Sequence, residues 1–328
     1  MRPFLLLCLL ATAACSPWAG HGPVSARLRR QLERQAVGRA EFEASLTGRS
    51  VVTDRRLVLP FRMEDDAVPV LDVEVNGVDG VPLILDTGAS ATLLHAYTAS
   101  LAGVRLLAAE EGSVPMQGVI GVEQARIGLV RRLRLGGWTL EGFPCLVRLH
   151  ENRISLTGAS FRHNLLGFDL LRRHCSHVTL DFPGRSVEFA FTGRFQPQPG
   201  RQVAWAPFTV RQGAPFITLG SGDQRWQAVV DTGSFNGIEI SREVAERLGV
   251  AGQGQPVEGL ILLSVGGTVR SDDAGLRTVR LADLSLFGEA WRDAPVDISP
   301  GPPRVGSCFL RDYRVTFDFR SGRIWLER

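Results

Sequence analysis

The sequence predicts an all-β protein built from two similar lobes, and three observations support this prediction. From Arg56 onward, short apolar or alternating runs are separated by Gly, Pro and Asn-Gly, as in strands joined by tight turns. The motif Asp-Thr-Gly occurs twice, at Asp86 and Asp231, each time after an apolar run. The sequence around these motifs repeats with a period of about 140 residues. Two copies of one unit predict two lobes, residues 56–195 and residues 196–328.

The bulk composition restricts the class of protein. At 328 residues, the chain is long enough for two domains of ordinary size. It is 44% hydrophobic and 22% charged, which is typical of a globular protein. The formal charge of +3 is small for this length, so no nucleic-acid partner is expected. All 37 basic residues are arginine, which excludes mechanisms that need a lysine, such as a Schiff base.

The first residues have the features of an export signal. Residues 1–14 carry an early positive charge, an apolar centre and small residues at the end, and they are too short to span a membrane. The stretch Thr12-Ala-Ala-Cys15 resembles a bacterial lipobox, with Thr12 where Leu is usual. An acylated Cys15 would anchor the protein to the bacterial membrane, and Ser16 after it favours the outer membrane, facing the periplasm or the surface. The alternative is an ordinary signal peptide cleaved nearby, with Cys15 incidental.

Residues 15–55 are predicted to be a lipid-anchored tether that is partly helical. The stretch Val24–Leu46 is rich in Arg, Glu, Gln and Ala, with Leu28, Leu32 and Val37 at irregular helical spacing. We expect a solvated helix that holds the rest of the protein away from the membrane. A propeptide that shields the active site is the alternative.

The body of the chain is predicted to be strands in sequence order. In the first lobe the strand-like runs are Leu57–Phe61, Val68–Val75, Pro82–Leu85, Thr92–His95, Arg126–Leu135, Trp138–Leu140, Phe143–Leu149, Val178–Phe182 and Ser186–Phe191. Asn76-Gly77 predicts a two-residue hairpin turn. The Pro-rich stretch Gln196–Gly200 is the expected linker between the lobes.

The duplication extends beyond the two Asp-Thr-Gly motifs. Leu59-Pro-Phe aligns with Ala206-Pro-Phe, and Leu165-Leu166-Gly167 aligns with Arg304-Val305-Gly306. A similar strand-like sequence follows each glycine, as Val178-Thr-Leu-Asp-Phe and Val315-Thr-Phe-Asp-Phe. The second copy differs at one informative position, because Arg304 takes the place of the first apolar residue.

The paired turns resemble those of aspartic proteases of the pepsin and retropepsin type, over about residues 56–328. They read Val81-Pro-Leu-Ile-Leu-Asp86-Thr87-Gly88-Ala89-Ser90 and Gln227-Ala-Val-Val-Asp231-Thr232-Gly233-Ser234. The resemblance implies two retropepsin-like β-barrel lobes with the active site in the cleft between them. It also implies that Asp86 and Asp231 are catalytic, because two close carboxyls can share one proton and activate a water.

The resemblance assigns supporting roles as well. Thr87 and Thr232 would bond across to the opposite loop, and the small residues Gly88, Ala89, Gly233 and Ser234 would let the loops approach. Ser234 offers a hydroxyl to its aspartate, whereas Ala89 does not. An apolar-Gly element would thread behind each loop, with residues Leu165, Leu166 and Gly167 in the first lobe and Val305 and Gly306 in the second. Hairpin flaps are expected at residues 112–121 and 258–267.

The function implied by this resemblance is an aspartic endopeptidase that acts on peptides or proteins as a monomer, without a cofactor. The alternative is a non-catalytic peptide-binding lipoprotein on the same scaffold, and both motifs could also be plain turns. His174, Cys175 and His177 lack a convincing zinc spacing, so no metal site is predicted and the histidines are expected at the surface. Cys145, Cys175 and Cys308 are an odd number, which permits at most one disulfide without indicating which.

Overall fold

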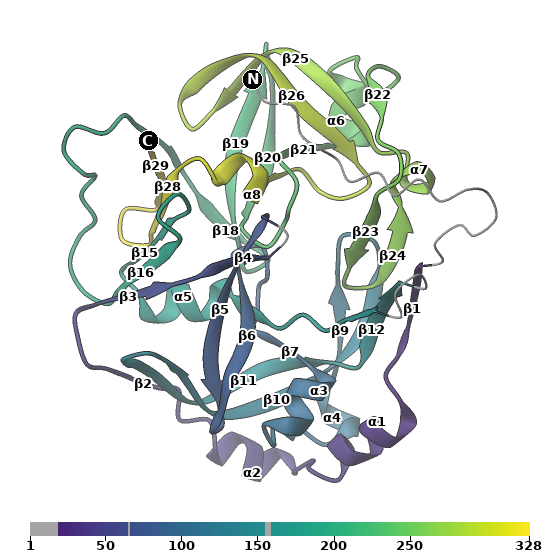
Figure 1. Ribbon diagram of the computed structural model, residues 1–328, viewed down its shortest axis with the longest axis vertical. Helices are drawn as coiled ribbons and strands as arrows, with labels where there is room; N and C mark the ends of the chain where they lie inside the picture. The colour runs from purple at the N-terminus through teal and green to yellow at the C-terminus, as the bar shows by residue number, and fades with distance from the viewer. Residues whose placement is uncertain (1–18, 65, 155–158) are drawn as a thin grey trace.

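The computed structural model describes residues 19–64, 66–154 and 159–328, which form a mostly β protein of two lobes (Figure 1). The first lobe occupies the lower half of the view, in purple to teal, and the second lobe the upper half, in green to yellow. The signal peptide predicted at residues 1–14 and the lipidation site predicted at Cys15 lie outside the described residues. Within those residues, no helix is long and apolar enough to cross a membrane.

The first lobe is built on one large sheet. Its path is β2 (Arg49–Val52), β11 (Trp138–Arg148), β7 (Leu93–His95), β14 (Leu165–Gly167), β6 (Val78–Asp86), β5 (Val68–Val75), β10 (Val122–Leu135) and β8 (Arg105–Leu106), with β4 (Arg62–Glu64) on β5 and β9 (Ser113–Gln117) on β10. A further pairing of β10 with β11 curls the sheet back on itself. The turn between β5 and β6 is the predicted Asn76-Gly77 hairpin, with positive φ at both residues.

The second lobe repeats this arrangement. Its path is β18 (Thr209–Arg211), β19 (Ala214–Ser221), β20 (Gln224–Asp231), β27 (Arg304–Gly306), β21 (Ile238–Ser241), β26 (Glu289–Ser299), β25 (Arg277–Leu286) and β22 (Gln255–Pro256), and β19 also pairs with β25. The hairpin of β23 (Ile261–Ser264) and β24 (Gly267–Arg270) forms a separate two-stranded sheet. In both lobes, a short strand ending in Gly lies parallel to the strand ending in Asp.

A six-stranded sheet joins the two lobes. Its order is β17 (Val203–Pro207), β29 (Arg323–Glu327), β28 (Arg314–Asp318), β15 (His177–Asp181), β16 (Ser186–Ala190) and β3 (Arg56–Pro60). Each half of the chain supplies three of these strands, and β15 pairs with β28 across the junction. One buried apolar core runs through both lobes and this sheet. The two lobes are therefore fixed to each other by continuous hydrogen bonding and packing.

Residues 19–52 correct the prediction of a free, solvated tether. Strand β1 (Ala19–Pro23) pairs with β12 (His150–Ile154), which pairs with β13 (Ala159–Phe161), and β2 pairs with β11. Helix α1 (Ala26–Glu33) buries Leu28 and Leu32 in the core of the first lobe. The two leucines are four residues apart, so they lie on one face of the helix. Burying this apolar face against the lobe is more favourable than leaving it in water. The segment is part of the first lobe.

The remaining helices are short, and two of them begin with a side-chain cap. They are α2 (Arg39–Ala44), α3 (Ala96–Leu101), α4 (Ala109–Gly112), α5 (Phe168–His174), α6 (Arg242–Arg247), α7 (Ser271–Ala274) and α8 (Ser307–Leu310). His95 caps α3 and Ser241 caps α6, each by accepting a backbone N–H within the first turn. Helices α5 and α8 follow the two short strands that end in Gly and lie at equivalent places in the two lobes.

Candidate active site

The structure brings the two Asp-Thr-Gly turns together at the junction of the lobes. Asp86 ends β6 and Asp231 ends β20, and both residues are partly exposed. A side-chain carbon added at Gly88 would collide with the carboxyl group of Asp231, and one added at Gly233 would collide with that of Asp86. Each carboxyl group therefore lies directly against the backbone of the opposite turn. Only glycine permits so close an approach at these two positions.

The two threonines tie the turns to each other. Thr87 Oγ1 donates to the carbonyl of Val230 at 2.6 Å and accepts from the amide of Thr232 at 3.1 Å. Thr232 Oγ1 makes the reciprocal pair, with the carbonyl of Leu85 at 2.6 Å and the amide of Thr87 at 3.1 Å. Both threonines are fully buried. These four bonds cross between the lobes and fix the spacing of the aspartates.

The carboxyl groups also receive backbone donors from their own turns. The amide of Ala89 donates to Asp86 Oδ1 at 2.9 Å, and that of Gly233 donates to Asp231 Oδ1 at 3.0 Å. Burial nevertheless raises the pKa of Asp86 well above its ordinary value, and the neighbouring Asp231 raises that pKa further. Two carboxyls this close favour a state in which one of them holds a proton.

Ser234 differs from what the sequence led us to expect. In the described part of the chain, no hydrogen bond joins its hydroxyl to Asp231. Its amide lies 3.3 Å from the carbonyl of Asp231, and its own carbonyl accepts from the amide of Ser307 at 2.7 Å. Ser307, which the sequence analysis missed, also donates its hydroxyl to the carbonyl of Thr232 at 2.7 Å. A serine in the turn of helix α8 thus supports the second loop from behind.

The apolar-Gly elements lie directly behind the turns. Gly167 pairs with Asp86, and Gly306 pairs with Asp231, in parallel register. Leu166 and Val305 are fully buried beneath the two turns. A side chain added at either glycine would strike the backbone of the neighbouring loop. This close packing holds both aspartate-bearing strands in place.

The two predicted flaps are hairpins whose tips touch. The β9–β10 hairpin turns at residues 118–121, and the β23–β24 hairpin turns at Val265 and Gly266. The amide of Val119 donates to Ser264 Oγ at 2.9 Å, and the backbones of Gly121 and Gly266 are in contact. The first lobe therefore contacts the second here as well as at the turns.

A buried ionic cluster, not foreseen from the sequence, holds these tips together. The carboxylate of Glu123 accepts from Arg148 Nε at 2.6 Å, His21 Nε2 at 2.7 Å and the amide of Gly266 at 3.3 Å. Asn152 Nδ2 donates to the carbonyl of Ser264 at 3.1 Å. Burial opposes ionisation, but the bonds from Arg148, His21 and Gly266 keep the pKa of Glu123 below its ordinary value. No spacing in the sequence links these residues.

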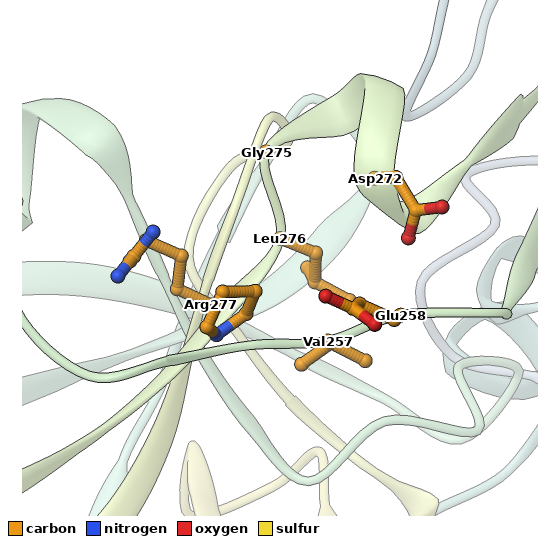
Figure 2. A pocket seen from close by; sticks show the side chains of 7 residues that line it. Val257, Glu258, Asp272, Gly275, Leu276 and Arg277 are labelled. Atoms are coloured by element: carbon orange, nitrogen blue, oxygen red, sulfur yellow. The ribbon is translucent and has the colours of Figure 1, made fainter.

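A cavity of about 470 Å³ lies in the second lobe, apart from the two turns. It is lined by Pro256, Val257, Glu258, Asp272, Gly275, Leu276 and Arg277 (Figure 2). The guanidinium of Arg277 points away from Glu258, and it donates to the carbonyls of Gln253 and Gly254. Arg270 Nη2 donates to Asp272 at 3.2 Å. Arg277 and Asp272 are thus engaged with the protein itself, and no lining residue belongs to either Asp-Thr-Gly turn.

The remaining candidate residues are histidines and cysteines. Across the described residues, no cluster of three or more His, Cys, Asp or Glu could hold a metal ion. His177, expected at the surface, is 2% exposed and lies 3.7 Å from Glu188, because it belongs to the central strand β15. Cys145, Cys175 and Cys308 are free thiols, the first two buried and the third exposed.

The chain resembles known proteins in one family. A family model described as aspartyl protease matches residues 71–170, which include Asp86, the first hairpin and Leu165 to Gly167. A comparison with curated protein sequences finds no match. Among solved structures, the aspartic proteinase from Irpex lacteus aligns with 83% of this chain and 97% of its own length, at 14% identity and a TM-score of 0.48. Through residues 71–170, the chain is therefore similar to the aspartyl protease family.

Proposed function

We propose that the protein is an aspartic endopeptidase that hydrolyses peptide bonds with water activated by Asp86 and Asp231. The observation that carries this proposal is the interlock of the turns, in which each carboxyl group lies against the glycine of the opposite turn. This arrangement holds two carboxyls close enough to share one proton, which is what general acid–base attack by water requires. A pair of plain turns would not need both cross-lobe threonine bonds and both glycine contacts.

The raised pKa of Asp86 suggests how the two carboxyls divide the work. Asp231, ionised, takes a proton from the water as the water oxygen bonds to the scissile carbonyl carbon. Asp86 gives its proton to the carbonyl oxygen, which produces a neutral tetrahedral diol. The C–N bond then breaks as the leaving nitrogen takes the proton held by Asp231, and one hydroxyl proton returns to Asp86. The proton count balances, and both carboxyls end in their starting states.

The substrate would be an extended peptide that lies between the lobes, beneath the two hairpins. Strand-like peptides bind through main-chain hydrogen bonds at sheet edges and hairpins, and β9–β10 and β23–β24 offer such edges. Because the hairpin tips are in contact, they must part before a chain can enter. We expect substrate binding to be coupled to this opening.

We also propose that the protein is exported and anchored to a bacterial membrane through Cys15. The signal-like residues 1–14 and the lipobox-like sequence support this proposal. Only three residues separate Cys15 from β1, so Ala19 would lie within about 14 Å of the anchor. The β1 side of the first lobe would then face the membrane. Cell fractionation tests this: Cys15→Ser should move the protein from the membrane fraction to the soluble fraction, and no shift would count against the anchor.

The test of the proposed activity is a peptide-library cleavage assay on the purified wild-type protein. We expect internal cleavage of extended peptides, with inhibition by a statine-type mimic of the tetrahedral intermediate. Peptides that bind without being cut would instead favour the alternative, a peptide-binding lipoprotein on the same scaffold. Cleavage that is insensitive to the mimic and abolished by a chelator would contradict the proposed mechanism.

A further inference from the structure

The two lobes present matching strips of residues beside the aspartates, and the strips differ in chemistry. Strand register aligns four positions in each lobe. In the first lobe the strip consists of Ile84, Leu165, Leu93 and Leu146; in the second lobe it consists of Val229, Arg304, Glu239 and Asp297. We call these the lobe-one strip and the lobe-two strip. Only the first position, Ile84 in one strip and Val229 in the other, is apolar in both lobes.

Strand alternation places both strips on the face that carries the aspartates. Successive side chains of a strand point to opposite faces, so Val229 shares a face with Asp231, two residues on. Val230 and Val305 point the other way, into the core. Arg304 pairs in register with Val229 and therefore lies on the aspartate face. Glu239 pairs with Arg304, and Asp297 pairs with Glu239, so both side chains lie on this same face.

Arg304 is buried and only partly satisfied. Its Nε forms an ion pair with Glu239 Oε2 at 2.7 Å, without hydrogen-bond geometry, and the two side chains are 6% and 2% exposed. Its Nη2 is buried and has no hydrogen-bond partner in the part of the chain that the structure describes. A side chain added at Gly301 would strike both this Nη2 and a methyl group of Val119. The free donor therefore lies at the loop before β27, close to the tip of the first hairpin.

The lobe-two strip holds one cationic side chain, whose N–H, unpaired among the described residues, favours an added acceptor. A guanidinium keeps its charge at all relevant pH values, and a buried N–H without an acceptor is unfavourable. Burial raises the pKa of both Glu239 and Asp297. Asp297 Oδ1 already accepts from Thr278 Oγ1 at 2.5 Å. The acceptor that Arg304 Nη2 lacks can come from a bound chain.

We propose that Arg304 selects a substrate with an acidic side chain beside the scissile bond, on the side that lies against the second lobe. The lobe-one strip selects an apolar side chain on the other side of that bond. This inference rests on the proposed peptidase function and adds the class of substrate to it. A carboxylate fits because it accepts two parallel N–H bonds from a guanidinium. An apolar residue at the same place would leave the buried donor unpaired.

The test compares matched peptides that differ only at the residues flanking the cleaved bond. We expect the wild type to cleave peptides with one apolar and one Asp or Glu flanking residue at least tenfold faster, in kcat/KM, than peptides with Leu or Lys in the acidic place. Arg304→Leu should remove this preference, and Arg304→Lys should restore part of it. The double variant Arg304→Leu/Glu239→Leu copies the lobe-one strip at its second and third positions, leaves Asp297 bonded to Thr278, and should prefer apolar residues on both sides. Leu165→Ala, at the register-matched place, should leave the acidic preference unchanged.

The outcomes distinguish a failure of this inference from a failure of the proposed peptidase function. Efficient cleavage with Leu or Lys preferred in the wild type would overturn this inference and leave the peptidase intact. An acidic preference that survives in the folded double variant would also overturn it. Should the folded wild type cleave no peptide, the peptidase proposal fails, and the same matched peptides are compared by Kd. Tighter binding of the acidic peptide, lost in the double variant, would then support selection by Arg304, and equal binding would refute it.

Discussion

The threonine bonds between the turns give the sharpest prediction about stability. In Thr87→Val, a methyl group replaces the hydroxyl at nearly constant volume. Two buried backbone groups then lose their hydrogen bonds to the Thr87 hydroxyl. They are the carbonyl of Val230, at 2.6 Å, and the amide of Thr232, at 3.1 Å. Each unsatisfied buried group costs about 1–3 kcal/mol, so the free energy of unfolding should fall by about 2–6 kcal/mol. Thr87→Ser keeps both bonds and loses one methyl, which costs about 1 kcal/mol.

Urea unfolding of the wild type and the two variants, followed by tryptophan fluorescence, measures these differences. The valine variant should also lose activity, because the spacing of Asp86 and Asp231 depends on the same bonds. The serine variant controls for the loss of side-chain volume. If Thr87→Val unfolds within about 0.5 kcal/mol of Thr87→Ser, the hydroxyl bonds do not hold the turns together and the reasoning fails.

Four further predictions concern protonation, the hairpins, the thiols and assembly. Because the folded pKa of Asp86 is raised, the stability of the wild type should fall relative to Asp86→Asn as pH rises through that pKa, and parallel pH–stability curves would contradict this. Glu123→Gln should lower the protection of the hairpin-tip amides against hydrogen exchange, measured relative to the intrinsic rate at each pH, as should a pH below the lowered pKa of Glu123 in the wild type; unchanged protection would show that the ionic cluster does not hold the tips. An alkylating reagent should label the exposed thiol of Cys308 first, because burial raises the pKa of Cys145 to about 12 and raises that of Cys175 further. Early labelling of Cys145 or Cys175 would refute their burial. Specific activity should not change on dilution, because one chain supplies both turns, whereas a loss on dilution would indicate that dimers form the site.

The sequence predicts much of the framework because the signals are local or duplicated. Apolar alternation and the Asn76-Gly77 turn indicate strands and a hairpin, and the structure has both there. The resemblance to aspartic proteases implies which strands lie side by side, because it places an apolar-Gly element behind each Asp-Thr-Gly turn. The pairing of Gly167 with Asp86 and of Gly306 with Asp231 agrees with that implication.

The features that the sequence does not predict depend on contacts between distant residues. The Arg-rich segment at residues 24–46 reads as solvated, but its few apolar residues, such as Leu32, find a matching surface on the first lobe. The ionic cluster joins Glu123 to His21, 102 residues earlier, and to Gly266, 143 residues later, so no local pattern reveals it. Arg304 is visible in the sequence as a break in the repeat. Its partner Glu239 becomes evident only when strand register is known.

The central claim is that Asp86 and Asp231 together activate the attacking water. The measurement that tests it most directly is kcat/KM for a cleaved peptide in Asp86→Asn and in Asp231→Asn, each shown to be folded by its circular dichroism. Removing one partner of a general acid–base pair should lower the rate by about 10²–10⁴-fold or more in each variant. If either variant keeps turnover within a few-fold of the wild type, the two carboxyls do not act as a pair and the proposed mechanism is contradicted.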